Sequence, residues 1–101
     1  TVAVDNHFNR EFRKGFDGQP EPFHYTWEDR MHSGFFFWGN AFRELGASLA
    51  TVGTAPTAAS LRGVDVFIVV DPDTPKETAN PNYVSDADVK ALADWVKAGG
   101  V

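Results

Sequence analysis

Two clusters of polar residues in this sequence could form a site, and each directly follows a segment expected to be a strand. The first cluster comprises Asp5, Asn6, His7 and Asn9, and the second comprises Asp71, Asp73, Thr74, Lys76 and Glu77. Ligands of open parallel sheets bind beyond the carboxyl ends of the strands, so neighbouring strands would bring both clusters to one crevice. Asp5, His7 and Asp71 are then candidates for acid–base chemistry. The alternative is that Asp71 and Asp73 only shape a turn around Pro72, because Asp is a common turn residue.

The connection between residues 6 and 32 is unusually long, and long connections often carry function. It places aromatic rings beside carboxylates and imidazoles: His24, Tyr25, Trp27, Glu28, Asp29 and His32. An aromatic ring can stack on the apolar face of a sugar while polar groups bind its hydroxyls, but the same rings also suit packing. We expect residues 23–33 to fold back over the carboxyl edge of the sheet and meet residues 71–75. Trp27, Glu28 and Asp29 would then either touch a ligand or seal the crevice.

Other common kinds of site have weaker support. The three histidines, His7, His24 and His32, lack the spacing of a helical zinc motif. Asp5 and His7 could act as metal ligands together with Asp71 or Asp73 only if the fold brought them close to one another. No metal is expected. The chain has no cysteine and no glycine-rich phosphate loop or GxSxG motif, so thiolate chemistry and nucleotide binding through such loops are not expected. We predict no cofactor.

The segments that position these residues alternate in type along the chain. Strands are expected at residues 1–5, 47–52 and 64–70, the last almost continuously apolar as in a strand buried on both faces. A largely buried aromatic helix is expected from an N-cap at Ser33 to about Leu45, and a short helical turn near residues 57–63. A last helix would follow Ser85, which resembles a capping box with Asp88.

This order predicts an α/β domain with a parallel sheet and helices on both faces. The strands at residues 1–5 and 64–70 are expected to be adjacent and parallel, which would place Asp5 and Asp71 at one edge. The segment at residues 6–32 could also contain a hairpin, with residues 22–27 as one arm. Residues 100 and 101 resemble the start of a further strand, so residues 1–101 are expected to be the N-terminal part of one domain, truncated at its C-terminal end.

Composition limits the possible partners. The chain has 101 residues and a formal net charge of -5, with no basic run, so neither nucleic acid nor an anionic membrane surface is an expected partner. No apolar run approaches the length needed to span a membrane. Nine Phe and three Trp are many for this length, so large rings are expected in the core or at a site.

Four segments together resemble one family. They are VAVDNHFNREF (residues 2–12), FHYTWEDRMHSGF (23–35), VDVFIVVDPDTPKE (64–77) and DWVKAGGV (94–101). They resemble the class I, flavodoxin-like glutamine-amidotransferase-like domain attached to bacterial unsaturated rhamnogalacturonyl hydrolases of glycoside hydrolase family 105. The resemblance implies a three-layer α/β/α sandwich with a mainly parallel sheet. It also implies pectin breakdown in a secreted or periplasmic setting, with the hydrolase site on a separate (α/α)6 barrel.

The resemblance carries over no catalytic triad, because amidotransferases use a cysteine and this chain has none. The expected function is therefore a non-catalytic accessory module of an enzyme that degrades rhamnogalacturonan. Its partners would be carbohydrate or the neighbouring catalytic domain of the same chain. The alternative function is an independent hydrolase or other carbohydrate-active enzyme, with a carboxylate and histidine site at the carboxyl edge of the sheet.

Overall fold

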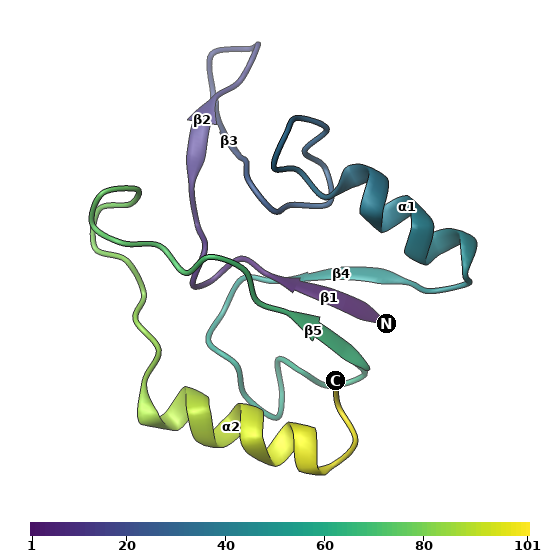
Figure 1. The fold of residues 1–101 in the computed structure, drawn as a ribbon. Helices are drawn as coiled ribbons and strands as arrows, with labels where there is room; N and C mark the ends of the chain where they lie inside the picture. Colours follow the sequence, from purple (N-terminus) through teal and green to yellow (C-terminus); the bar gives the residue numbers. More distant parts are fainter.

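The centre of the fold is strand β1 (Val2–Asp5), which lies between two parallel neighbours. All 101 residues are described in the structure, a computed structural model (Figure 1). Strand β4 (Leu49–Val52) pairs with β1 on one side and strand β5 (Val66–Ile68) on the other. The predicted parallel pairing of the first and third strands is confirmed. Both outer strands are shorter than predicted, because residues 47, 48, 64, 65, 69 and 70 lie outside the ladders.

A small antiparallel hairpin occupies part of the long connection. It consists of β2 (Phe12–Lys14) and β3 (Pro20–Pro22), and it projects away from the parallel sheet (Figure 1). A hairpin was expected here, but residues 22–27 do not form one of its arms. The turn contains Gly15 and Gly18, and the positive φ of Gly18, +80°, suits glycine. The sequence signal for the hairpin therefore lay in the turn glycines.

Helix α1 (Phe36–Glu44) begins later than the sequence suggested. The predicted N-cap at Ser33 is wrong, because the Ser33 carbonyl accepts a hydrogen bond from the Tyr25 N–H at 2.8 Å and belongs to the preceding loop. Phe35 occupies the N-cap position without a side-chain cap. The expected burial is also wrong: Phe37 and Leu45 are 72% and 86% exposed, since α1 contacts the sheet along only one stripe. That stripe includes Gly39, the one fully buried residue of α1.

Helix α2 (Asp86–Lys97) starts at the predicted capping box. The Ser85 hydroxyl accepts a hydrogen bond from the Asp88 N–H at 3.2 Å, and the Asp88 carboxylate accepts one from the Ser85 N–H at 2.8 Å. These bonds to Ser85 hold the pKa of Asp88 below its usual value. Two otherwise unpaired backbone N–H donors at the helix start are thus satisfied by side chains four residues apart or less.

Substituting Ser85 with alanine is expected to lower the free energy of unfolding by about 1 kcal/mol, the usual cost of losing an N-cap hydroxyl. Urea denaturation followed by circular dichroism measures this loss. Ser48→Ala is a suitable control, because no side-chain hydrogen bond of Ser48 is present. An equal loss in both variants would show that the capping box contributes nothing specific.

The two helices lie on opposite sides of the three parallel strands (Figure 1). The core between them is thin, since only 15 of 101 residues are buried. Val89 and Val96 on α2 are 57% and 55% exposed, and the predicted short helix near residues 57–63 is a series of turns. The side of α2 that faces the sheet carries the buried Asp88 and also Trp95, whose ring centre lies 6.4 Å from that of Phe67 on β5.

The outer side of β5 is already partly paired. The Phe67 N–H donates to the Val101 carbonyl at 2.8 Å, and the Val101 N–H donates to the Asp65 carbonyl at 3.0 Å. This alternation is that of a parallel ladder, in which one residue bonds to two residues flanking its partner. Residue 101 therefore lies beside β5, on the side of that strand away from β1.

Candidate functional site

The carboxyl ends of β1 and β5 meet, and they bring the two polar clusters together as the sequence suggested. The Asp73 N–H donates to the Phe8 carbonyl at 2.7 Å, and the Asn9 side-chain amide donates to the Asp71 carbonyl at 3.2 Å. The Arg10 N–H donates to the Asp73 carboxylate at 2.8 Å. These bonds cross directly between the clusters, so the edge is a closed hydrogen-bonded surface. No cavity is lined by residues from either cluster.

The Asp5 carboxylate organises the backbone that follows β1. It is 3% exposed and accepts hydrogen bonds from the N–H groups of His7, Phe8 and Asn9 at 3.1, 2.9 and 3.1 Å. Burial raises the pKa of Asp5, and the three backbone bonds oppose that rise. A carboxylate surrounded in this way holds a turn in shape and has little capacity left for a substrate.

The other members of the first cluster are also occupied locally. The Asn6 side-chain amide donates to the Asn9 carbonyl at 3.2 Å. The His7 ring lies 3.4 Å from the Asn82 side-chain nitrogen, and that nitrogen also donates to the His7 carbonyl at 2.9 Å. The imidazole therefore has Asn82 as its hydrogen-bond partner, and the structure does not place it in a hydrogen bond with Asp5 or Asp71.

Asp73 is a second buried carboxylate with a structural role. One oxygen accepts from the Arg10 N–H and from the Thr78 hydroxyl at 2.6 Å, which ties the 71–78 loop to the end of β1. Its other oxygen has no partner, and the side-chain oxygen of the neighbouring Asn9 has none either. A buried polar atom without a hydrogen-bond partner is costly, so these two oxygens offset part of what the other bonds of this loop contribute.

Residues 23–33 reach the 71–75 loop through a single side-chain contact. The Tyr25 hydroxyl donates to the Asp71 carboxylate at 3.2 Å, and burial followed by this interaction raises the pKa of Tyr25. Tyr25 and Asp71 both have left-handed backbones, with φ of 53° and 48°, as does His24 with 59°. Such conformations cost about 1 kcal/mol or more each in non-glycine residues, so the surrounding contacts hold this pair in place.

Trp27 belongs to the core. It is 3% exposed, its indole N–H donates to the Ala50 carbonyl of β4 at 2.7 Å, and it packs with Val2 and Val4. A Cβ on Gly39 would lie 2.9 Å from the Trp27 ring, so α1 approaches the indole as closely as glycine permits. The sequence suggested that Trp27 either touches a ligand or seals the crevice. Its buried position suits the sealing role and leaves no face of the indole ring open to a ligand.

Asp29 is equally buried and fixes the loop around it. Its carboxylate accepts from the His24 N–H at 3.1 Å and the Met31 N–H at 2.9 Å, and it lies 3.5 Å from the Arg13 guanidinium. Burial alone would raise the pKa of Asp29, but the two backbone bonds and Arg13 outweigh it, so the pKa is lowered. Asp29 therefore joins the loop to the hairpin, away from Asp71 and Asp73.

Asp29→Asn is expected to cost about 1 kcal/mol or more at neutral pH, because the amide replaces an acceptor-only group that receives two backbone bonds. A lowered pKa in the folded state means that ionised Asp29 stabilises the fold above its unfolded pKa. This contribution disappears as the pH falls through the folded pKa. The stability difference between wild type and variant should shrink from about pH 6 to about pH 3 in urea titrations. A difference that stays constant over this range would contradict the assignment.

A groove between the hairpin and residues 28–31 is lined mainly by charged residues. It has a volume of about 470 Å³, and we call its eight lining residues the hairpin groove: Arg13, Phe16, Glu21, Pro22, Glu28, Asp29, Arg30 and Met31. Glu28 and Asp29 were candidates from the sequence. Sequence reasoning missed Arg13, Phe16 and Arg30, although a phenylalanine inside a glycine turn, Gly15–Gly18, was a visible signal.

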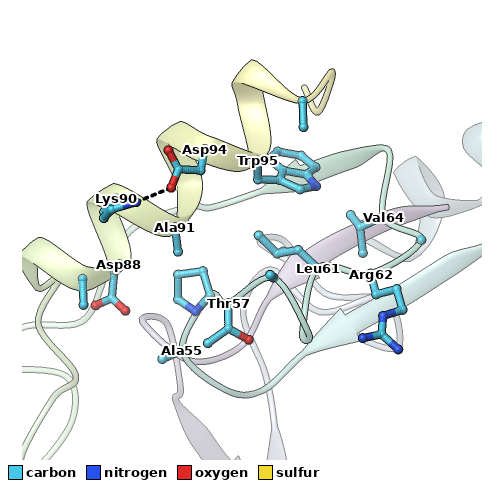
Figure 2. A pocket seen from close by; sticks show the side chains of 15 residues that line it. Ala55, Thr57, Leu61, Arg62, Val64, Asp88, Lys90, Ala91, Asp94 and Trp95 are labelled. Carbon is cyan, nitrogen blue, oxygen red and sulfur yellow. Dashed lines mark hydrogen bonds and ion pairs between the residues drawn. The ribbon is translucent and has the colours of Figure 1, made fainter.

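The largest cavity lies between α2 and residues 55–64 (Figure 2). It has a volume of about 860 Å³ and is mainly apolar, with Pro56, Leu61, Val64, Ala91 and Trp95 in its walls. The Lys90–Asp94 ion pair, at 2.5 Å, lies on the α2 side (Figure 2). The lining of this cavity includes none of the residues that the sequence suggested for a site.

No three His, Asp or Glu side chains converge in a group that could hold a metal ion. Asp5, His7, Asp71 and Asp73 thus lie at one edge without forming a ligand set. No helix has the length and apolar character needed to cross a membrane. No family model, curated protein or solved structure matches the chain.

Proposed function

We propose that this chain is a non-catalytic accessory α/β module of a carbohydrate-degrading enzyme, acting on pectin of the rhamnogalacturonan type. The observation that carries the proposal is that the carboxylates at the strand ends already accept hydrogen bonds from the protein itself. Asp5 accepts three backbone N–H bonds, and Asp73 accepts a backbone and a hydroxyl bond. Groups committed in this way support a structural or binding role more than acid–base chemistry.

The alternative, a hydrolase using Asp5, His7 and Asp71, receives less support. A general base needs hydrogen-bond reach to a substrate proton, and a catalytic histidine is commonly oriented by a carboxylate. Asp5 is enclosed by its own turn, and the His7 ring is paired with Asn82. Asp71 is exposed, but its partner is the Tyr25 hydroxyl.

The sugar class and the setting rest on the resemblance of the four segments to domains attached to rhamnogalacturonyl hydrolases. On this proposal the protein is secreted or periplasmic, and its partners are carbohydrate or a neighbouring catalytic domain. Residues 1–101 would be the N-terminal part of a three-layer α/β/α sandwich. The parallel sheet with one helix on each side (Figure 1) supports this layered arrangement.

The direct test combines a turnover assay with a binding assay. The intact chain is incubated with unsaturated rhamnogalacturonan disaccharide, and product is followed by chromatography while binding is followed by calorimetry. We expect no turnover in the wild type or in His7→Ala. Turnover that disappears in His7→Ala would overturn the proposal and favour the hydrolase.

A further inference from the structure

We propose that the hairpin groove is a sugar-binding site, in which Phe16 stacks on one pyranose ring and fixed polar groups bind its hydroxyls. The class of ligand rests on the proposed function, whereas the location rests on the geometry of the groove. Its volume of about 470 Å³ falls within the range of about 300–1,000 Å³ common for small-molecule sites.

The polar wall of the groove is held in position before any ligand arrives. The Arg13 guanidinium lies 2.7 Å from the Glu21 carboxylate and 3.5 Å from Asp29, and Asp29 is itself fixed by two backbone N–H groups. A guanidinium has five N–H donors, so these two contacts leave others free. Donors and acceptors lie side by side, which matches a sugar hydroxyl because each hydroxyl both donates and accepts.

The charges of the groove are nearly balanced. Glu21 and Asp29 pair with Arg13, and the exposed Glu28 accompanies the exposed Arg30 on the rim. The Arg30 guanidinium lies 4.0 Å from the centre of the Phe36 ring, which fixes its position without neutralising it. A groove without a surplus of positive charge suits hydroxyl groups better than phosphates, which require clustered cations.

Two exposed apolar side chains complete the site. Phe16 is fully exposed at the hairpin turn, and Met31 on the loop is 57% exposed. Both line the groove, yet neither contributes to the core. A phenylalanine held in water by a two-stranded hairpin gains nothing from folding, and a sugar face stacked on it would remove that apolar area from water.

The test is an NMR titration of the intact, ¹⁵N-labelled chain with rhamnose, with galacturonate and with unsaturated rhamnogalacturonan disaccharide. We expect saturable shifts in the amides of residues 13–21 and 28–31 with all three sugars, since each presents a hydroxyl-bearing ring. Phe16→Ala should weaken binding roughly tenfold, the loss expected when a stacked ring is removed. Phe37→Ala is the matched control, because Phe37 is a similarly exposed phenylalanine on α1, outside the groove.

Arg30→Gln provides a second variant that leaves the core untouched, and it should also weaken binding while Phe37→Ala does not. Shifts confined to residues 5–9 and 71–75 would overturn the groove as the site and leave the proposed function standing. Unchanged spectra at saturating sugar concentrations would overturn both the groove and the sugar-binding part of the proposed function. Equal binding by wild type and Phe16→Ala would overturn the stacking role.

Discussion

Trp27→Ala is expected to lower the free energy of unfolding by about 4 kcal/mol, the middle of the range for large-to-small core substitutions of aromatic residues. The indole is 3% exposed, and it contacts three rings from α1 and its N-terminal turn: Phe35, Trp38 and Phe42. Removing it would leave a cavity between α1 and β4 and would remove the indole hydrogen bond to the Ala50 carbonyl. Urea denaturation followed by far-ultraviolet circular dichroism is the appropriate measurement, because Trp fluorescence changes with the substitution itself.

Two variants separate the contributions of Trp27. Trp27→Phe retains an aromatic ring but loses the indole N–H, so it should cost about 1–2 kcal/mol from the lost hydrogen bond and reduced packing. Trp38→Ala removes an indole that is 45% exposed, and it should cost clearly less than Trp27→Ala. Equal losses for Trp27→Ala and Trp38→Ala would contradict the central position that the structure gives to Trp27.

Asp5→Ala is expected to cost about 3 kcal/mol or more, because it leaves three backbone N–H groups without their acceptor in a buried turn. The same turn carries Phe8, one of the most deeply buried side chains of the molecule. The loss is measured by urea denaturation, and Asp71→Ala is the control because that carboxylate is exposed. A smaller loss for Asp5→Ala than for Asp71→Ala would remove the structural role assigned to Asp5.

Asp5→Asn tests the same contact through its pH dependence. The folded pKa of Asp5 is raised by burial, so its contribution to stability is fully present below the unfolded pKa and decreases as the pH rises through the folded pKa. The cost of Asp5→Asn should therefore shrink as the pH rises from about 3 to about 6, whereas the cost of Asp29→Asn should grow. If the costs of Asp5→Asn and Asp29→Asn changed with pH in the same direction, the direction of the pKa shift assigned to one of these two carboxyl groups would be wrong.

Features encoded by local patterns were predicted well. The pairing of β1 with β5 followed from a β-branched apolar run and from the alternation of element types, both of which reflect burial within a parallel sheet. The start of α2 followed from Ser85 and Asp88, because a capping box is satisfied within four residues. Gly46, which follows the C-cap residue Leu45 of α1, has a φ of +86°, a conformation that glycine adopts without strain.

Several features set by side-chain contacts between distant segments were not predicted. Ser33 looked like an N-cap, but its carbonyl is bound by Tyr25, and the helix starts only beyond that loop. Trp27 and Asp29 were expected to belong to one site, but their side chains contact different parts of the structure. The indole donates a hydrogen bond to β4, and the carboxylate pairs with Arg13 of the hairpin. Nothing in a single sequence fixes which distant segment such side chains meet, so the groove between hairpin and loop was missed.

The central place of β1 has a consequence for the order in which the chain can fold. Val2 pairs with Leu49 on one side and Val66 on the other, so β1 stays without these partners until residues 49–68 have been synthesised. Pairings between such distant segments slow folding, because a long loop must close before any contact compensates for it. Until then the apolar residues of β1 are open to association with other chains. The helices can form early from local contacts, but the rate of folding depends on the moment when β4 and β5 enclose β1.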